Sequence, residues 1–209
     1  MLGACYVADR HLCALAVALQ VNLSIQYGNS PISAYSYAAY GIVINNYRQD
    51  PLCADRFCQL ASVLASQPNA ENIRVETSGA IGLFLHHRTA HLRETLPIFE
   101  SGYQTGLATG KLEHVGYHIE GLCSTAFWCG KNLSKLEHQI RAYHQQLLDL
   151  KQVSSAHYCA IYWETVLVLL GNPDGIELAF AAPVGAANLP PTERLLSPER
   201  QGVAEEELL

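Results

Sequence analysis

The stretch LSKLEHQIRAYHQQLLDL, residues 133–150, decides the fold class of this chain. Its apolar side chains recur at steps of three and four residues: Leu133, Leu136, Ile140, Tyr143, Leu147 and Leu150. Residues spaced in this way share one face of an α-helix, and charged or amide side chains occupy most of the remaining surface. The stretch therefore predicts an amphipathic helix that buries one face.

Two further segments repeat this helical pattern. A stripe of the same kind runs through Leu92, Leu96, Phe99, Tyr103 and Leu107. Because Pro97 lies within that stripe, we expect the helix to be kinked or to begin later than His91. Residues 156–170 are apolar nearly all round, which predicts a helix packed between neighbours. No extended period-two alternation occurs, so the sequence predicts an all-α protein.

Helix ends are marked by proline and glycine. Ser30-Pro31 and Asp50-Pro51 each place a capping side chain before a proline, as at a helix start. Gly110, Gly130 and the Gly171-Asn172-Pro173 run predict helix ends, because glycine adopts the left-handed conformation of a cap and proline cannot continue the ladder.

The predicted helices fall into pairs that repeat about every forty residues. We expect hairpins near residues 31–67, 70–110, 112–152 and 154–180, within one helical-repeat domain over residues 1–182. This spacing is typical of a TPR-like helical-repeat solenoid of about four hairpins.

Small residues in the middle of these helices predict close helix packing. Gly79 and Gly82 lie in one first helix, Gly116 and Gly121 in another, and Gly102, Gly106 and Gly110 follow a four-residue spacing. A glycine brings a neighbouring helix nearer because it carries no side chain.

The two ends of the chain differ from this pattern. Residues 183–209 combine several prolines with Glu205, Glu206 and Glu207, which predicts a disordered, acidic tail. The apolar run at Leu12–Leu19 is too short for a membrane span and lacks the flanks of a signal peptide, so we expect a buried helix there.

Composition excludes several classes of protein. Of the 209 residues, 49% are hydrophobic and 15% charged, and the net charge is −6. The apolar content argues against wholesale disorder, and the negative charge argues against binding to nucleic acid or an anionic membrane. Seven cysteines occur without a CxxC pair, which disfavours a disulfide framework or zinc ribbon and favours a cytoplasmic location.

Histidines offer the main alternative chemistry. His114 and His118 lie at i and i+4 on one predicted helix face, and His86, His87 and His91 cluster near a turn. Such groups could make a small metal-binding or phosphotransfer protein. The chain has no HExxH motif, no G-x-S-x-G motif and no Ser or Thr after Lys111 to complete a phosphate loop, so we assign no catalytic, cofactor-binding or metal residue.

Tyrosines predict where a partner would bind. Several fall on the first helices of the pairs, which line the concave face of many two-helix solenoids. Packing in the core and between repeats is the favoured explanation for them, and a ligand held between helices near Trp128 or Trp163 is a third alternative. The candidate interaction groove consists of Tyr40, His114, Tyr117, His118 and Tyr162.

Five stretches carry a resemblance to a known family. They are VNLSIQYGNSP at residues 21–31, AYSYAAYGIVI at 34–44, HLRETLPIFESGYQTGLATG at 91–110 with its continuation to Tyr117, residues 133–150, and residues 161–171. These resemble the central TPR-like helical region of bacterial multi-sensor signalling kinases. In that family a serine/threonine kinase domain, an AAA-type ATPase, the helical region, a GAF domain and a histidine kinase follow one another.

The resemblance implies a role without catalysis. It extends over roughly residues 12–172, and no kinase, ATPase or ATP-lid motif accompanies it. We therefore expect a protein-interaction or signal-relay segment that binds a protein partner or itself within a kinase signalling system.

Overall fold

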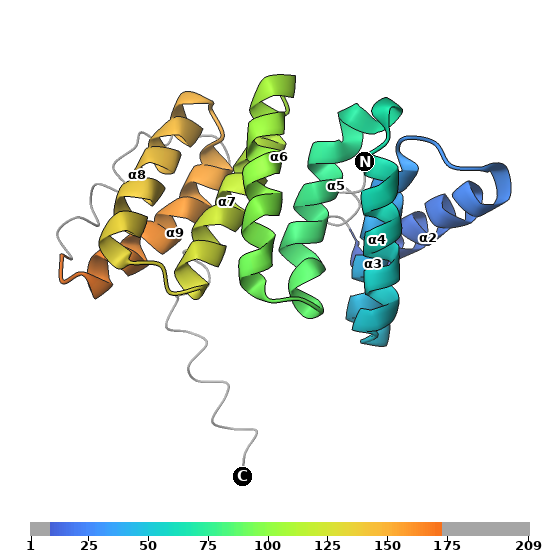
Figure 1. Ribbon diagram of the computed structural model, residues 1–209, viewed down its shortest axis with the longest axis horizontal. Helices are drawn as coiled ribbons and strands as arrows, with labels where there is room; N and C mark the ends of the chain where they lie inside the picture. The colour runs from blue at the N-terminus through green and yellow to red at the C-terminus, as the bar shows by residue number, and fades with distance from the viewer. Residues whose placement is uncertain (1–8, 173–209) are drawn as a thin grey trace, which may run out of the picture.

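The chain forms a row of α-helices packed in neighbouring pairs (Figure 1). The computed structural model describes residues 9–172, and at Asn69 the backbone only. No strand occurs in this part of the chain, so the predicted all-α class is confirmed. The predicted tail at 183–209 and the end of the last hairpin, beyond 172, lie outside the described residues.

Eight α-helices and three short 3-10 helices make up the described part. The α-helices are α2 (Arg10–Tyr27), α3 (Ser33–Arg48), α4 (Pro51–Ala65), α5 (Glu71–Phe84), α6 (Leu96–Thr109), α7 (Leu112–Trp128), α8 (Leu133–Asp149) and α9 (Val153–Leu169). The 3-10 helices are η1 (Pro68–Ala70), η2 (His86–Arg88) and η3 (Leu92–Thr95).

Most helix ends follow the residues that predict them. The Asp50 side chain accepts a hydrogen bond from the Cys53 amide at 2.9 Å and caps α4. Gly110 ends α6 at a φ of 72°, and Pro97 lies in the first turn of that helix. The prediction at Ser30-Pro31 is wrong by two residues: Pro31 lies in a turn, and α3 begins at Ser33.

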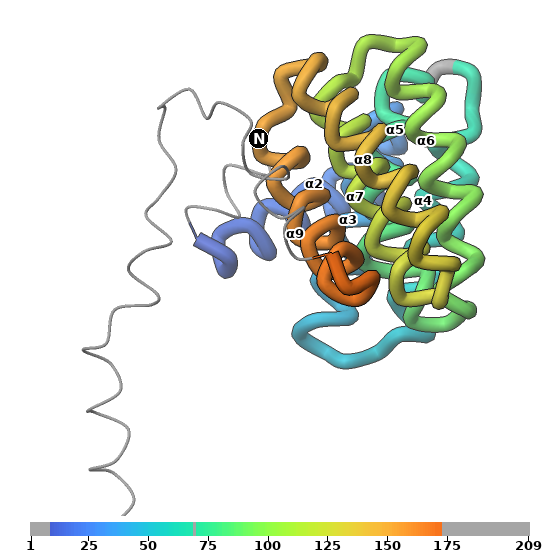
Figure 2. The backbone as a smooth tube through the Cα atoms, turned by 90° about the vertical axis from the view of Figure 1, so that its left-hand side faces the viewer, coloured from blue at the N-terminus to red at the C-terminus, as the bar shows by residue number. Residues whose placement is uncertain are grey.

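The helices form two layers. Consecutive contacts join α3, α5, α7 and α9, and each of α4, α6 and α8 packs against the helices before and after it. Figure 2 looks along the row and shows α4, α6 and α8 on one side of it. The first helix of each pair therefore lies in one layer and the second in the other, which brings α3, α5, α7 and α9 onto a shared surface.

Apolar side chains gather in two clusters, one toward each end of the row. The first joins α7, α8 and α9 and includes Ile119, Leu136, Ile140, Leu147 and Trp163. The second joins α2 to α5 and is built from smaller side chains, with Ala38, Ala54, Cys58 and Ala61 among its members. The stripe that predicts α8 is confirmed, since Leu136, Ile140 and Leu147 are fully buried.

Between the clusters, glycines hold α5, α6 and α7 close together. The buried Phe99 ring occupies the space that a Cβ at Gly82 or Gly121 would need, at 2.6 and 2.5 Å. A Cβ at Gly102 would lie 2.0 Å from the His118 ring. The prediction that the glycines permit close packing is confirmed, and large rings from α6 and α7 fill the space.

The buried face of α6 overlaps the predicted one only in part. Of the stripe at Leu92, Leu96, Phe99, Tyr103 and Leu107, only Phe99 is buried, and Leu107 is exposed. Gly102 and Gly106 are buried instead. Because close helix approach needs small side chains at its centre, the larger residues flank the contact.

Both end helices are more exposed than their sequences predict. The expected burial of the helix at Leu12–Leu19 is wrong: α2 buries only Val17 and Val21, while Leu15 and Leu19 are 68% and 59% exposed. On α9 the side opposite the core is likewise uncovered, with Tyr158, Ile161, Val168 and Leu169 exposed. Each helix has described neighbours on one side only.

No helix between residues 9 and 172 combines the length and the apolar character that a membrane span requires.

Candidate functional site

A groove crosses the layer formed by the first helices. It encloses about 820 Å³ and takes its walls from α3, α5, α7 and the start of α9. Polar and aromatic side chains line much of it: Tyr35, Glu76, Glu113, His114, Tyr117, His118, Glu120, Lys151 and Tyr158. Ligand sites usually have this size and mixture of apolar and polar walls, which makes the groove the leading candidate site among the described residues.

Helical spacing brings these side chains to one surface. On α7, Glu113, Tyr117 and Glu120 follow steps of four and three residues. Glu76, Gly79 and Leu83 do the same on α5. Tyr35 on α3 and Tyr158 on α9 add an aromatic ring from either side, so four helices contribute to one continuous surface.

The structure brings together three of the five sequence-predicted site residues. His114, Tyr117 and His118 line the groove. Tyr40 packs edge-on against Phe57 with ring centroids 5.0 Å apart, as part of the cluster that joins α2 to α5. The Tyr162 ring packs against the Phe127 ring with the ring centroids 5.9 Å apart. Tyr40 and Tyr162 therefore serve core packing, the alternative that the sequence left open.

Tyr117 and its neighbours form the polar rim of the groove. The Tyr117 hydroxyl donates a hydrogen bond to Glu113 Oε1 at 3.2 Å. The His114 and Tyr117 rings meet edge to face at 5.8 Å. Partial burial, followed by the Glu113 charge, raises the pKa of Tyr117, and burial likewise raises the pKa of Tyr35. Both tyrosines are therefore neutral hydroxyl groups at neutral pH.

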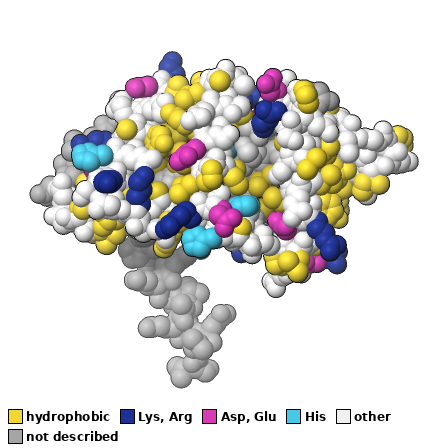
Figure 3. Space-filling view, in the orientation of Figure 1, with side chains coloured by type: hydrophobic (Ala, Val, Ile, Leu, Met, Phe, Trp, Pro, Cys, Tyr) yellow, Lys and Arg dark blue, Asp and Glu magenta, His cyan; other side chains and the backbone are white. Residues whose placement is uncertain are grey.

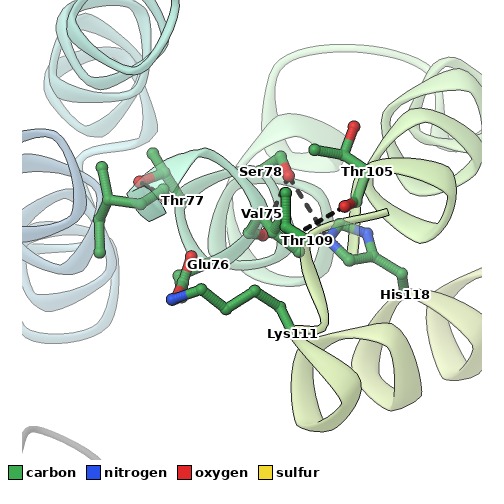
Figure 4. A network of polar contacts seen from close by, with 9 residues as sticks. Val75, Glu76, Thr77, Ser78, Thr105, Thr109, Lys111 and His118 are labelled. Atoms are coloured by element: carbon green, nitrogen blue, oxygen red, sulfur yellow. Dashed lines mark hydrogen bonds and ion pairs between the residues drawn. The ribbon is translucent and has the colours of Figure 1, made fainter. Parts of the chain in front are cut away.

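His118 lies at the floor of the groove and has a structural role. Its side chain is fully buried, and its Nε2 lies 3.0 Å from the Val75 carbonyl oxygen and 3.4 Å from Ser78 Oγ (Figure 4). Burial lowers the pKa of His118, with the Val75 hydrogen bond opposing that shift. The ring is therefore neutral and joins α7 to α5.

An ion pair connects the same helices beside the groove. Lys111 Nζ donates to Glu76 Oε1 at 2.7 Å (Figure 4). The other carboxylate oxygen, Glu76 Oε2, is buried without a partner. Only one side of this carboxylate is therefore compensated.

Sequence reasoning missed Glu120, the groove residue with the least compensated charge. Burial raises the pKa of the Glu120 carboxyl. The signal that could have found it is its position three residues after Tyr117, which puts both side chains on the same side of α7.

The remaining histidines of the described residues include His91, which precedes η3. Within residues 9–172, no three His, Cys, Asp or Glu side chains lie together in a way that could hold a metal ion. His91 Nδ1 accepts a hydrogen bond from the Arg93 amide at 3.1 Å, and Glu94 Oε1 accepts one from the His91 amide. His91 therefore caps η3.

Neither a family model, nor a curated protein, nor a solved structure matches this chain.

Proposed function

We propose that this chain is a non-catalytic protein-interaction or signal-relay segment, a TPR-like stack similar to the helical region of bacterial multi-sensor signalling kinases. The proposal gives it a protein partner or a second copy of itself as its binding partner, in the cytoplasm. The free thiols fit a reducing compartment, since Cys123 and Cys159 lie 3.9 Å apart without a bond between the sulfur atoms.

The observation that carries the proposal is the row of uncovered leucines on α2. Leu12, Leu15, Leu19 and Leu23 are all exposed and follow steps of three, four and four residues. Arg10 is the only Lys, Arg, Asp or Glu in this 18-residue helix, and hydrophobic side chains lie along the α2 end of the molecule (Figure 3). A contiguous apolar surface of this kind marks a contact site on soluble proteins.

Stacked helical repeats explain why such a surface is a binding surface. Each repeat covers the apolar face of its neighbour, and a terminal repeat needs a polar outer face to remain soluble. The outer face of α2 is leucine, so another helical element has to cover it. The uncovered apolar side of α9 likewise has to be covered at the other end of the row.

Light scattering after size-exclusion chromatography, with binding of an apolar dye, tests the proposal. We compare the full chain with the double variant Leu15→Glu/Leu19→Glu and with the control Ile25→Glu, which changes an equally exposed apolar residue off the leucine row (70% exposed). We expect the natural chain to self-associate or bind the dye, the double variant to lose most of that behaviour, and the control to keep it. A stable monomer that binds no dye contradicts the proposal.

A further inference from the structure

The walls of the groove include three hydrogen-bond acceptors without a partner: two buried atoms, His118 Nδ1 and Glu76 Oε2, and the half-exposed carboxylate of Glu120. Because His118 Nε2 lies 3.0 Å from a carbonyl oxygen, it carries the proton, and the unpartnered Nδ1 of the neutral ring presents a lone pair. Glu76 Oε2 is a second buried acceptor without a donor. Within the described residues the Glu120 carboxylate has neither a hydrogen bond nor an ion pair. A hydrogen-bond donor in the groove can therefore reach Glu120, whereas the two buried atoms lie within the wall.

The charges that line the groove also favour an occupant that donates hydrogen bonds. Glu76, Glu113 and Glu120 stand against the single lysine Lys151, and the ion pair with Lys111 accounts for one oxygen of Glu76 only. A partly buried carboxylate without a partner is unfavourable, and a cation placed beside it removes that cost. The free groove thus favours a positively charged occupant.

Three tyrosine rings narrow the chemistry of that cation. Tyr35, Tyr117 and Tyr158 come from α3, α7 and α9. Tyrosine faces attract cations, and a guanidinium group both stacks on such a ring and presents five N–H donors to carboxylates. An ammonium group offers three donors and no flat surface.

We propose that the groove binds an extended segment of a partner protein through its arginine side chains. The inference rests on the proposed function and names the chemistry of one partner. Glu120 accepts the guanidinium hydrogen bonds, while Tyr117 and Tyr158 flank the arginine stem. An extended segment fits because the groove crosses four helices from Tyr35 to Tyr158.

Fluorescence anisotropy with labelled peptides tests this inference on the full chain. The probes are a Gly-Ser-Arg unit repeated four times and the same peptide with Gln, Lys or Glu in place of Arg. We expect the Arg peptide to bind most tightly and the Gln and Glu peptides not to bind, with affinity falling as salt is raised. Equal binding of the Gln or Lys peptide would overturn the assignment to arginine.

Variants separate the groove from the general negative charge of the chain. Glu120→Gln removes a groove carboxylate, and Glu100→Gln removes an exposed carboxylate on α6. We expect Glu120→Gln to weaken binding of the Arg peptide roughly tenfold, the scale of one charged hydrogen-bonding partner, and Glu100→Gln to leave it unchanged. Equal losses in the two variants would mean attraction to net charge alone and would overturn the proposal.

Two additional measurements keep the outcome interpretable. Tyr117→Ala, whose side chain is exposed on the groove rim, should also weaken Arg binding while circular dichroism stays that of the natural chain. Leu15→Glu/Leu19→Glu should bind the Arg peptide normally. If Leu15→Glu/Leu19→Glu loses self-association and still binds the peptide, the α2 surface is the site of self-association. If Glu120→Gln loses peptide binding and Leu15→Glu/Leu19→Glu does not, the groove is the peptide site. The two proposals can therefore fail separately.

Discussion

Two contacts between neighbouring helices show different ways of building one row. In the middle, α5, α6 and α7 meet across Gly82, Gly102 and Gly121, and the rings of Phe99 and His118 fill the space that the missing side chains leave. At the end, α8 and α9 meet through large side chains, and a buried carboxylate holds them together. There the Trp163 indole donates to Glu137 Oε1 at 2.9 Å.

The difference shows where each contact is sensitive. The middle contact depends on the absence of side chains, because a Cβ at Gly82, Gly102 or Gly121 would enter the volume of a ring. The α8–α9 contact depends on one buried carboxylate inside an apolar cluster. Glu137 is 5% exposed and accepts hydrogen bonds both from Trp163 and from Arg141 Nε, the latter at 3.0 Å. The first should fail when volume is added, and the second when a hydrogen-bond partner is removed.

Adding one carbon atom to the middle contact should have the largest effect. Gly102→Ala places a Cβ 2.0 Å from the buried His118 ring, which could move away only by giving up its hydrogen bond to Val75, so we expect a loss of about 2–3 kcal/mol in the free energy of unfolding. Urea denaturation measures it.

Gly79→Ala is the matched control for that variant. Its Cβ would lie 3.5 Å from the same ring, an ordinary contact, and alanine is the better helix former. We expect an unchanged or higher stability, by up to about 1 kcal/mol. A similar loss in both variants would contradict the account of the middle contact.

Removing the acceptor from the α8–α9 contact should have an intermediate effect. Glu137→Leu leaves the buried indole N–H of Trp163 without a partner, and we expect a loss of about 1–2 kcal/mol. The cost should shrink when Glu137→Leu is made in a Trp163→Phe background, because the buried indole donor is then absent and the Arg141 side chain, 57% exposed, can bond to water. Equal costs in the two backgrounds would mean that the hydrogen bond contributes nothing.

Acidification should affect the middle contact least. The folded-state pKa of His118 lies below the ordinary 6.5, so the stability it contributes is present above pH 6.5 and is lost as the pH falls from there through the lowered value. Urea unfolding at pH 7.5 and 5.5 should show a smaller difference in His118→Gln than in the natural chain.

His11→Gln serves as the control for that measurement. His11 is exposed and lies on α2, away from the middle contact, so this variant should keep the difference that His118 makes. A natural chain equally stable at both pH values would contradict the assignment.

Local patterns predict the helices and their close approach but not their partners. The Leu136, Ile140 and Leu147 spacing and the Gly79 to Gly121 series follow from helical periodicity and from side-chain size alone. That the Phe99 and His118 rings fill the glycine spaces depends on how three helices are placed, which no single segment specifies.

For the same reason, the sequence predicts only some of the residues that line the groove. His114, Tyr117 and His118 share a helix, so spacing predicts that they lie together. Glu120 is on that helix too. That its carboxylate has no partner becomes clear only from the positions of α5 and α9, which line the groove with it. Tyr40 and Tyr162 are tyrosines on first helices, as a groove residue would be, but in the structure they pack against the core clusters.

The two uncovered ends of the row have a consequence for assembly. The α2 surface is a line of leucines, whereas the α9 surface mixes Tyr158, Ile161, Val168 and Leu169, so the two are not copies of one patch. When the α2 surface of one copy binds the α9 surface of another, the pair still exposes one α2 surface and one α9 surface. Unless the copies close into a ring, the same contact can then be repeated without limit. An end-to-end assembly of this chain would therefore grow as a filament whose length rises with concentration, rather than stop at a dimer.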